Sequence, residues 1–335
     1  MNEIKSDICY VDLRSMLRDC IFRLQERVKK DDTLGVSSGF QPLDNLTDGF
    51  EKGKVYVIGG RPCMGKEEFM LSMIRNIAMK EVPVLLFSTN YKKSDYVQRL
   101  LSIHCNIHTL HLQQGIWEVF EWKRLDKEVG SLVDVPLFIH DSLDLPLDDL
   151  IETARKSIQV SGTKIIFIDC LQMIDFPKEC ENSSERIAKV MYALKQLASQ
   201  IDVPIVIGSM LGRGVEFREG LEGKQPQLMD LANSSYIEEM ADVVLMVHRP
   251  EYYHIYQDDN GRDLRGLIII NVMKNALKPL GRIYLEYQQE TGIIGQEKYA
   301  MPTGSKQVSL EDLDTDNKAI ESLVKAFDLE EELTY

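Results

Sequence analysis

The residues best suited to chemistry lie between Val55 and Lys66, in the run Val-Tyr-Val-Ile-Gly-Gly-Arg-Pro-Cys-Met-Gly-Lys. An apolar, β-branched stretch ends at Gly60, and four residues separate it from Gly65 and Lys66. In a strand, loop and helix with this G-x-x-x-x-G-K spacing, backbone N–H groups surround a phosphate, and the lysine reaches the terminal phosphates. The sequence therefore predicts a nucleotide phosphate site formed by Gly60, Arg61, Pro62, Cys63, Met64, Gly65, Lys66 and Glu67.

One position of this pattern departs from what the chemistry requires. A Ser or Thr hydroxyl normally follows the lysine and holds Mg²⁺, but here Glu67 follows it and Glu68 comes next. A carboxylate can bind Mg²⁺, yet it also brings negative charge beside the phosphates. The spacing of the loop predicts a nucleotide site, and the glutamate at position 67 indicates that the catalytic function of this site is impaired.

Asp169 is the second candidate for chemistry, because it closes the apolar run Lys-Ile-Ile-Phe-Ile-Asp over 164–169. An aspartate downstream of a phosphate loop is where such ATPases hold Mg²⁺, directly or through water. Many strands also end in an aspartate that only caps the next turn. With the phosphate loop upstream, we predict the metal-binding role for Asp169.

Alternating strands and helices must position these residues. Apolar runs predict strands from Val55 and over 82–88, 136–140, 164–169, 203–209, 242–248 and 266–272. Helical patterns are predicted over 41–46, 67–80, 94–104, 148–160 and 184–199. This alternation indicates an α/β fold with a mostly parallel, doubly wound sheet flanked by helices. In such sheets ligands bind at the carboxyl ends of the strands, where Gly60, Asn90, Asp169 and Ser209 emerge.

Composition narrows the class of protein. The 335 residues are 44% hydrophobic, which suffices for a sizeable core, and no run approaches the roughly 18 apolar residues of a membrane span. The six cysteines form no C-x-x-C pair, so a cytoplasmic protein without a zinc site or disulfide framework is expected. A net charge of −14 argues against a protein that binds nucleic acid over its whole surface. A local basic loop could still bind nucleic acid.

The predicted domain body covers 35–300, with a distinct segment at each end. Residues 1–34 form an N-terminal extension that contains an amphipathic helix over 12–30, whose apolar stripe packs either on its own domain or on a neighbouring subunit. Residues 301–335 form an acidic C-terminal tail with apolar residues at helical spacing.

Several motifs, in order and spacing, resemble the C-terminal ATPase domain of the DnaB replicative helicases. They are Gly35-Val36, Gly39-Phe40, Leu43-Asp44, Arg61 to Lys66, Asp169 to Gln172, Leu231, Ile237-Glu238, Ala241-Asp242 and His248 to Tyr253. The resemblance implies a RecA-like P-loop NTPase fold, ATP and Mg²⁺ as cofactors, and a role in DNA replication. It also makes the helix over 12–30 the family's linker helix, which packs on the next subunit of a hexameric ring. We expect no counterpart of the family's helical N-terminal domain.

The departures from this family fall on its catalytic positions. Where the family has the glutamate that activates water, this chain has Asn90, and an amide cannot take a proton. The glutamine that senses the γ-phosphate is replaced by Met210. In the finger region, which reaches the neighbouring subunit's nucleotide, Lys274 is kept and Ala276 replaces the arginine. Lys278 is nearby but lacks the guanidinium fork.

A loop over 210–227 aligns with the segment that faces the ring's channel in the family. It carries the DNA-binding candidates Arg213, Arg218 and Lys224. Glu216, Glu219 and Glu222 bring its net charge near zero. Two interpretations stay open, a loop that contacts single-stranded DNA and a solvated mobile loop.

Three functions follow from these residues. The first is a regulatory or structural DnaB-type paralogue with an impaired nucleotide site, which associates with itself or with an active ring. The second is a switch that binds ATP without hydrolysis. The third is an active ATP-dependent 5′ to 3′ helicase that uses substitute residues such as Glu67 as a Mg²⁺ ligand and Glu68 as a base.

Overall fold

The structure is a computed structural model that describes residues 13, 16–18, 35–175, 182–232, 234–276 and 278–299. Residues 34–301 form one compact unit. Residues 13 and 16–18 are helical, but the rest of the helix predicted over 12–30 lies outside the described residues, as does the predicted acidic tail.

A nine-stranded sheet forms the centre of the unit, in the order β3-β2-β4-β5-β1-β6-β7-β8-β9. The strands are β1 Val55–Gly60, β2 Val84–Ser88, β3 Leu137–Asp141, β4 Ile165–Ile168, β5 Ile205–Met210, β6 Val243–His248, β7 Leu267–Asn275, β8 Gly281–Gln288 and β9 Ile293–Glu297. Pairing is parallel from β3 across to β6 and antiparallel from β6 to β9. The predicted α/β fold with a mostly parallel sheet is confirmed.

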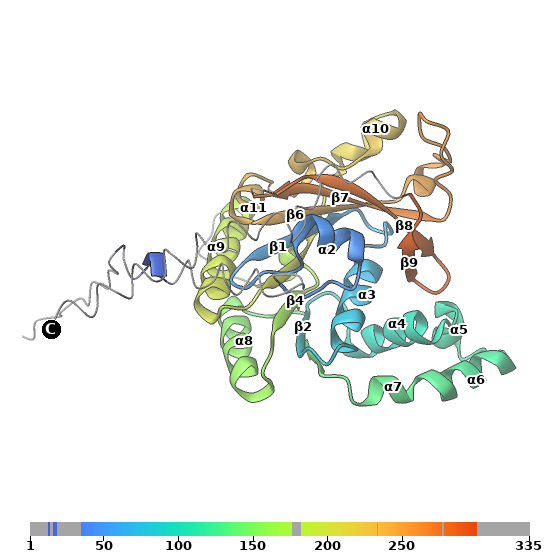
Figure 1. Cartoon of the computed structure of the whole chain (residues 1–335), viewed down its shortest axis with the longest axis horizontal. Coiled ribbons are helices and arrows are strands. Elements are labelled where there is room, and N and C mark those ends of the chain that lie inside the picture. Colours follow the sequence, from blue (N-terminus) through green and yellow to red (C-terminus); the bar gives the residue numbers. More distant parts are fainter. Residues whose placement is uncertain are drawn as a thin grey trace, which may run out of the picture. The chain divides into compact units, whose positions relative to one another are not determined.

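Helices cover both faces of this sheet (Figure 1). They are α2 Gln41–Thr47, α3 Lys66–Ala78, α4 Lys93–Cys105, α5 Thr109–Gln114, α6 Val119–Glu128, α7 Gly130–Val133, α8 Leu147–Ser161, α9 Ser183–Ile201, α10 Gly220–Lys224 and α11 Ser234–Met240. Short 3₁₀ turns are η1 Leu171–Met173, η2 Arg213–Phe217, η3 Leu228–Asp230 and η4 Pro250–Tyr253. In Figure 1, α5 to α7 lie beside α4, on the other side of the molecule from α8 and α9.

The two faces of the sheet bury two separate cores, and β1 shows why. Successive strand residues point to opposite faces, so Tyr56 and Ile58 join the core of α2, α3 and α4. Val55 and Val57 join the core of α8, α9 and α11. All six residues of β1 are buried, because helices cover both sides.

Every predicted strand and helix of the domain body is present, with bounds that differ by a few residues. The strands β8 and β9 and the helices between Thr109 and Val133 were not predicted. None of the described helices is long and apolar enough to span a membrane. The carboxyl ends of β1, β2, β4 and β5 meet at one edge, and the phosphate loop emerges there.

Candidate functional site

The phosphate loop connects β1 directly to α3. Gly65 precedes the helix with φ +86°, and a Cβ atom there would lie 2.8 Å from the Ile268 side chain, so this position requires glycine. Cys63 also has a positive φ of 63° and is exposed. The loop thus has the predicted strand, turn and helix geometry, with the N-terminus of α3 at its end.

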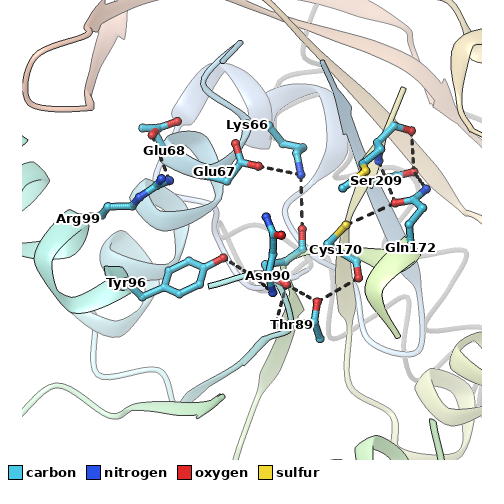
Figure 2. A network of polar contacts seen from close by, with 12 residues as sticks. Lys66, Glu67, Glu68, Thr89, Asn90, Tyr96, Arg99, Cys170, Gln172 and Ser209 are labelled. Atoms are coloured by element: carbon cyan, nitrogen blue, oxygen red, sulfur yellow. Dashed lines mark hydrogen bonds and ion pairs between the residues drawn. The ribbon is translucent and has the colours of Figure 1, made fainter. Parts of the chain in front are cut away.

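Lys66 is buried at the first position of α3, with 4% of its surface exposed. Its Nζ lies 3.2 Å from a carboxylate oxygen of Glu67 and 3.5 Å from the Asp169 carbonyl oxygen. Figure 2 shows this lysine pointing into the same space as Asn90. Lys66, which is expected to contact the phosphates of a nucleotide, is therefore ion-paired with the next residue in the chain, Glu67.

Glu68 has a different partner. Its carboxylate lies 3.5 Å from Arg99 of α4, and the Arg99 guanidinium lies over the Tyr91 ring, 4.4 Å from its centroid. Burial raises the pKa of Glu68 above its ordinary value, and the charge of Arg99 opposes this shift. Glu68 belongs to an ion pair between α3 and α4.

Asp169 follows β4 and accepts four hydrogen bonds within the site. The Thr89 backbone N–H and hydroxyl donate to Oδ1 at 2.9 and 2.6 Å. The Asn90 backbone N–H and the Tyr96 hydroxyl donate to Oδ2 at 3.2 and 2.6 Å. Only 3% of Asp169 is exposed. Sequence reasoning missed Thr89 and Tyr96 as partners of this carboxylate.

Met210 ends β5, at the position where the sequence resemblance implies a sensor glutamine. Its backbone N–H donates to Gln172 Oε1 at 3.0 Å, and Gln172 Nε2 donates to Ser209 Oγ at 2.9 Å. The amide of Gln172 thus joins the ends of β4 and β5 (Figure 2). The Met210 thioether adds no strong donor to this edge of the sheet.

Arg61 of the phosphate loop is held by the segment that follows β5. Its Nε lies 2.9 Å from Glu216 Oε1, and its Nη1 donates to the Leu211 carbonyl at 3.0 Å. The Tyr253 hydroxyl donates to the same Glu216 oxygen at 3.2 Å. Glu216 therefore links the phosphate loop to the segment that contains the DNA-binding candidates.

Two of the three DNA-binding candidates are also engaged within the chain. Arg218 pairs with Asp230, and Lys224 Nζ donates to the Glu216 carbonyl at 2.7 Å. Arg213 is exposed. The segment forms the short helices η2 and α10.

The finger region lies at the end of β7. Lys274 Nζ donates to the carbonyl groups of Glu238 and Glu239 at 2.6 and 3.1 Å, which caps the C-terminus of α11. Ala276 is exposed and has φ +41°. The two lysines near Ala276, Lys274 and Lys278, are both engaged within the chain, because Lys278 is ion-paired as well.

Lys278 bridges two acidic side chains near α2. It lies 2.8 Å from Asp48 and also pairs with Glu51. Burial lowers the pKa of Lys278, but its hydrogen bonds to these two carboxylates outweigh burial and raise the pKa above the ordinary value. Lys278 is therefore a structural cation of this chain.

A doubly wound sheet with a phosphate loop after β1 and an aspartate after β4 defines a P-loop nucleotide-binding domain of the RecA-like class. The family model of the DnaB-like helicase C-terminal domain matches residues 35–294, and the chain belongs to this family. The resemblance stated from the sequence and the RecA-like fold are thus confirmed. The functional roles of the site residues stay predictions.

Individual relatives agree with this family. A probable replicative DNA helicase of Trieres chinensis is 33% identical over 292 residues, which are 85% of this chain and 62% of the relative. The replicative DNA helicase DnaB of Treponema pallidum is 31% identical over 278 residues, 82% of this chain and 59% of the relative. The chain thus spans 62% and 59% of these two curated relatives.

A solved structure agrees with the fold. It is a DnaB-like replicative helicase, described with its interactions with primase, and its TM-score is 0.75 at 24% identity. The match covers 87% of this chain and 68% of that one. This likeness supports the fold of the chain alone.

Proposed function

We propose that this chain is a regulatory or structural DnaB-type paralogue whose nucleotide site binds ATP without effective turnover. Two features support this proposal. The phosphate loop has the strand, turn and helix geometry of a nucleotide site, but the residues at the positions expected to drive hydrolysis lack the required functional groups. Asn90 offers an amide where a base is needed, and Ala276 offers no guanidinium.

The observation that carries the proposal is that the nearby groups that could act as substitutes are already paired. The carboxylates of Glu67 and Glu68 are paired with Lys66 and Arg99. Lys278 is paired with two carboxylates near α2. A missing base costs about 10² to 10⁴ in rate, and a missing arginine finger about 10³ to 10⁵. Either loss would leave hydrolysis too slow to drive unwinding.

The second candidate is a switch, a chain whose conformation responds to bound ATP without phosphate release. The Arg61–Glu216 ion pair favours it, because phosphates that attract Arg61 would compete with Glu216. Nucleotide binding would then change the contacts of the segment over 210–227. DNA contact by Arg213 belongs to this candidate, as does association with a ring of related subunits through the helix over 12–30.

ATP binding and phosphate release by the full chain, with and without single-stranded DNA, test the proposal. We expect binding that Lys66→Ala removes and phosphate release no faster than in that variant. Lys80→Ala is the matched control, since Lys80 lies exposed just beyond the other end of α3. DNA-stimulated release that Lys66→Ala abolishes and Lys80→Ala leaves intact would make the chain an active helicase motor.

A further inference from the structure

The nucleotide site differs from the Mg²⁺ site that its fold class implies. Mg²⁺ requires near-octahedral oxygen ligands at about 2.0–2.1 Å, and P-loop domains supply a hydroxyl after the lysine and a carboxylate that follows another strand of the same sheet. Here Glu67 replaces the hydroxyl, and its carboxylate oxygen lies 3.2 Å from Lys66 Nζ. The first of the two ligand positions is therefore occupied by an internal ion pair.

The second position is Asp169, and all of its acceptor capacity is used. A carboxylate offers about four lone-pair positions. Two donors from Thr89 occupy Oδ1, and the Asn90 N–H and the Tyr96 hydroxyl occupy Oδ2, all within 3.2 Å. These four donors leave no lone pair for a cation or for the water molecules around one.

These donors indicate a structural role for Asp169 in place of metal binding. Thr89 and Asn90 follow β2, and Tyr96 lies on α4, so the carboxylate joins the end of β4 to both of these elements. Tyr96 is 3% exposed, and burial together with the charge of Asp169 raises its pKa, which keeps the phenol as a donor. Charge-assisted hydrogen bonds of this kind are stronger than neutral ones.

We propose that Asp169 is a structural clamp closed to divalent cations, so that the phosphate loop binds nucleotide without Mg²⁺. The second half of this statement rests on the proposed nucleotide site, whereas the first half stands on the Asp169 contacts alone. The residues of this chain thus do not fit the Mg²⁺ that the fold class implies.

Urea unfolding of the full chain without nucleotide tests the clamp. In Asp169→Asn the amide NH₂ group would face the donors, so we expect the folding equilibrium constant to fall about 30-fold or more. Asp259→Asn is the control, because it makes the same charge change at an exposed position. Equal stability of Asp169→Asn and the parent chain would overturn the clamp. If Asp169→Asn does not fold, Tyr96→Phe should lower the constant about tenfold, whereas Tyr192→Phe, at an exposed position of α9, should leave it unchanged.

Titration with N-methylanthraniloyl-ATP in MgCl₂ and in EDTA tests whether nucleotide binding depends on Mg²⁺. We expect the two dissociation constants to agree within about threefold. A tenfold or greater weakening in EDTA would overturn the inference. If this nucleotide does not bind at all, the proposed function fails, and the unfolding comparison alone decides whether Asp169 is a clamp.

Discussion

Glu67 controls how strongly the phosphate loop attracts an anion, and removing its charge should tighten nucleotide binding. Glu67→Gln keeps the size of the side chain and frees Lys66, whose Nζ lies 3.2 Å from the carboxylate. Only 5% of the Lys66 and 17% of the Glu67 side chain are exposed, so water screens this pair weakly.

The magnitude follows from Coulomb's law. Two unit charges about 4 Å apart interact by about 4 kcal/mol at an effective dielectric constant of about 20. Side-chain relaxation and salt reduce this value, so we expect a gain of roughly 1.4–2.8 kcal/mol, or about 10- to 100-fold in the dissociation constant.

Fluorescence titration with N-methylanthraniloyl-ATP in EDTA, at two salt concentrations, measures this gain. Glu81→Gln serves as the control, since it makes the same charge change at an exposed position just after α3. We expect the gain of Glu67→Gln to persist at high salt because its site is buried. Unchanged binding in Glu67→Gln would refute the reasoning, and weaker binding would show in addition that Glu67 helps to hold the ligand.

Two further predictions concern stability. His248 is 1% exposed and burial lowers its pKa from 6.5 to about 4, so its contribution is present above pH 6.5 and lost as the pH falls toward 4. Between pH 7.5 and 5 the free energy of unfolding should therefore fall by about 2 kcal/mol more in the parent chain than in His248→Phe, measured by urea unfolding. Equal pH dependence of the two proteins would contradict this. Lys274→Met should lose about 1–2 kcal/mol of stability in the same assay, because it removes the cap of α11. Unchanged stability would instead leave Lys274 available to a neighbouring subunit.

The sequence was sufficient for the parallel half of the sheet, for a simple physical reason. Its central strands β1, β2 and β4 are buried on both faces and appear as continuous apolar runs, whereas the edge strand β3 is only partly buried. β8 has a mixed burial pattern and exposes Glu286, so its run is interrupted. The helices α5 and α7 bury no residue, and without a buried face there is no apolar periodicity to detect.

The candidate site could be predicted only in part. The phosphate loop is a local pattern, and so are the replacements at Asn90 and Met210. The contacts of Asp169 join residues 73 to 80 positions apart in the chain, and the Arg61–Glu216 pair joins residues 155 apart. Such partners are set by which strand ends meet at one edge, and no spacing rule in the sequence specifies them.

Cys63 gives the phosphate loop a reactivity of its own. Its thiol is exposed, whereas Cys105 and Cys170 are buried, so among these three described cysteines it is the one that alkylating reagents and oxidants can reach. A bulky adduct on this thiol would lie in the cavity that Cys63 lines together with Glu68 and Arg99. The rate of Cys63 alkylation, followed by mass spectrometry, therefore reports whether the loop is covered. The unmodified chain carries this footprinting probe without any engineered label.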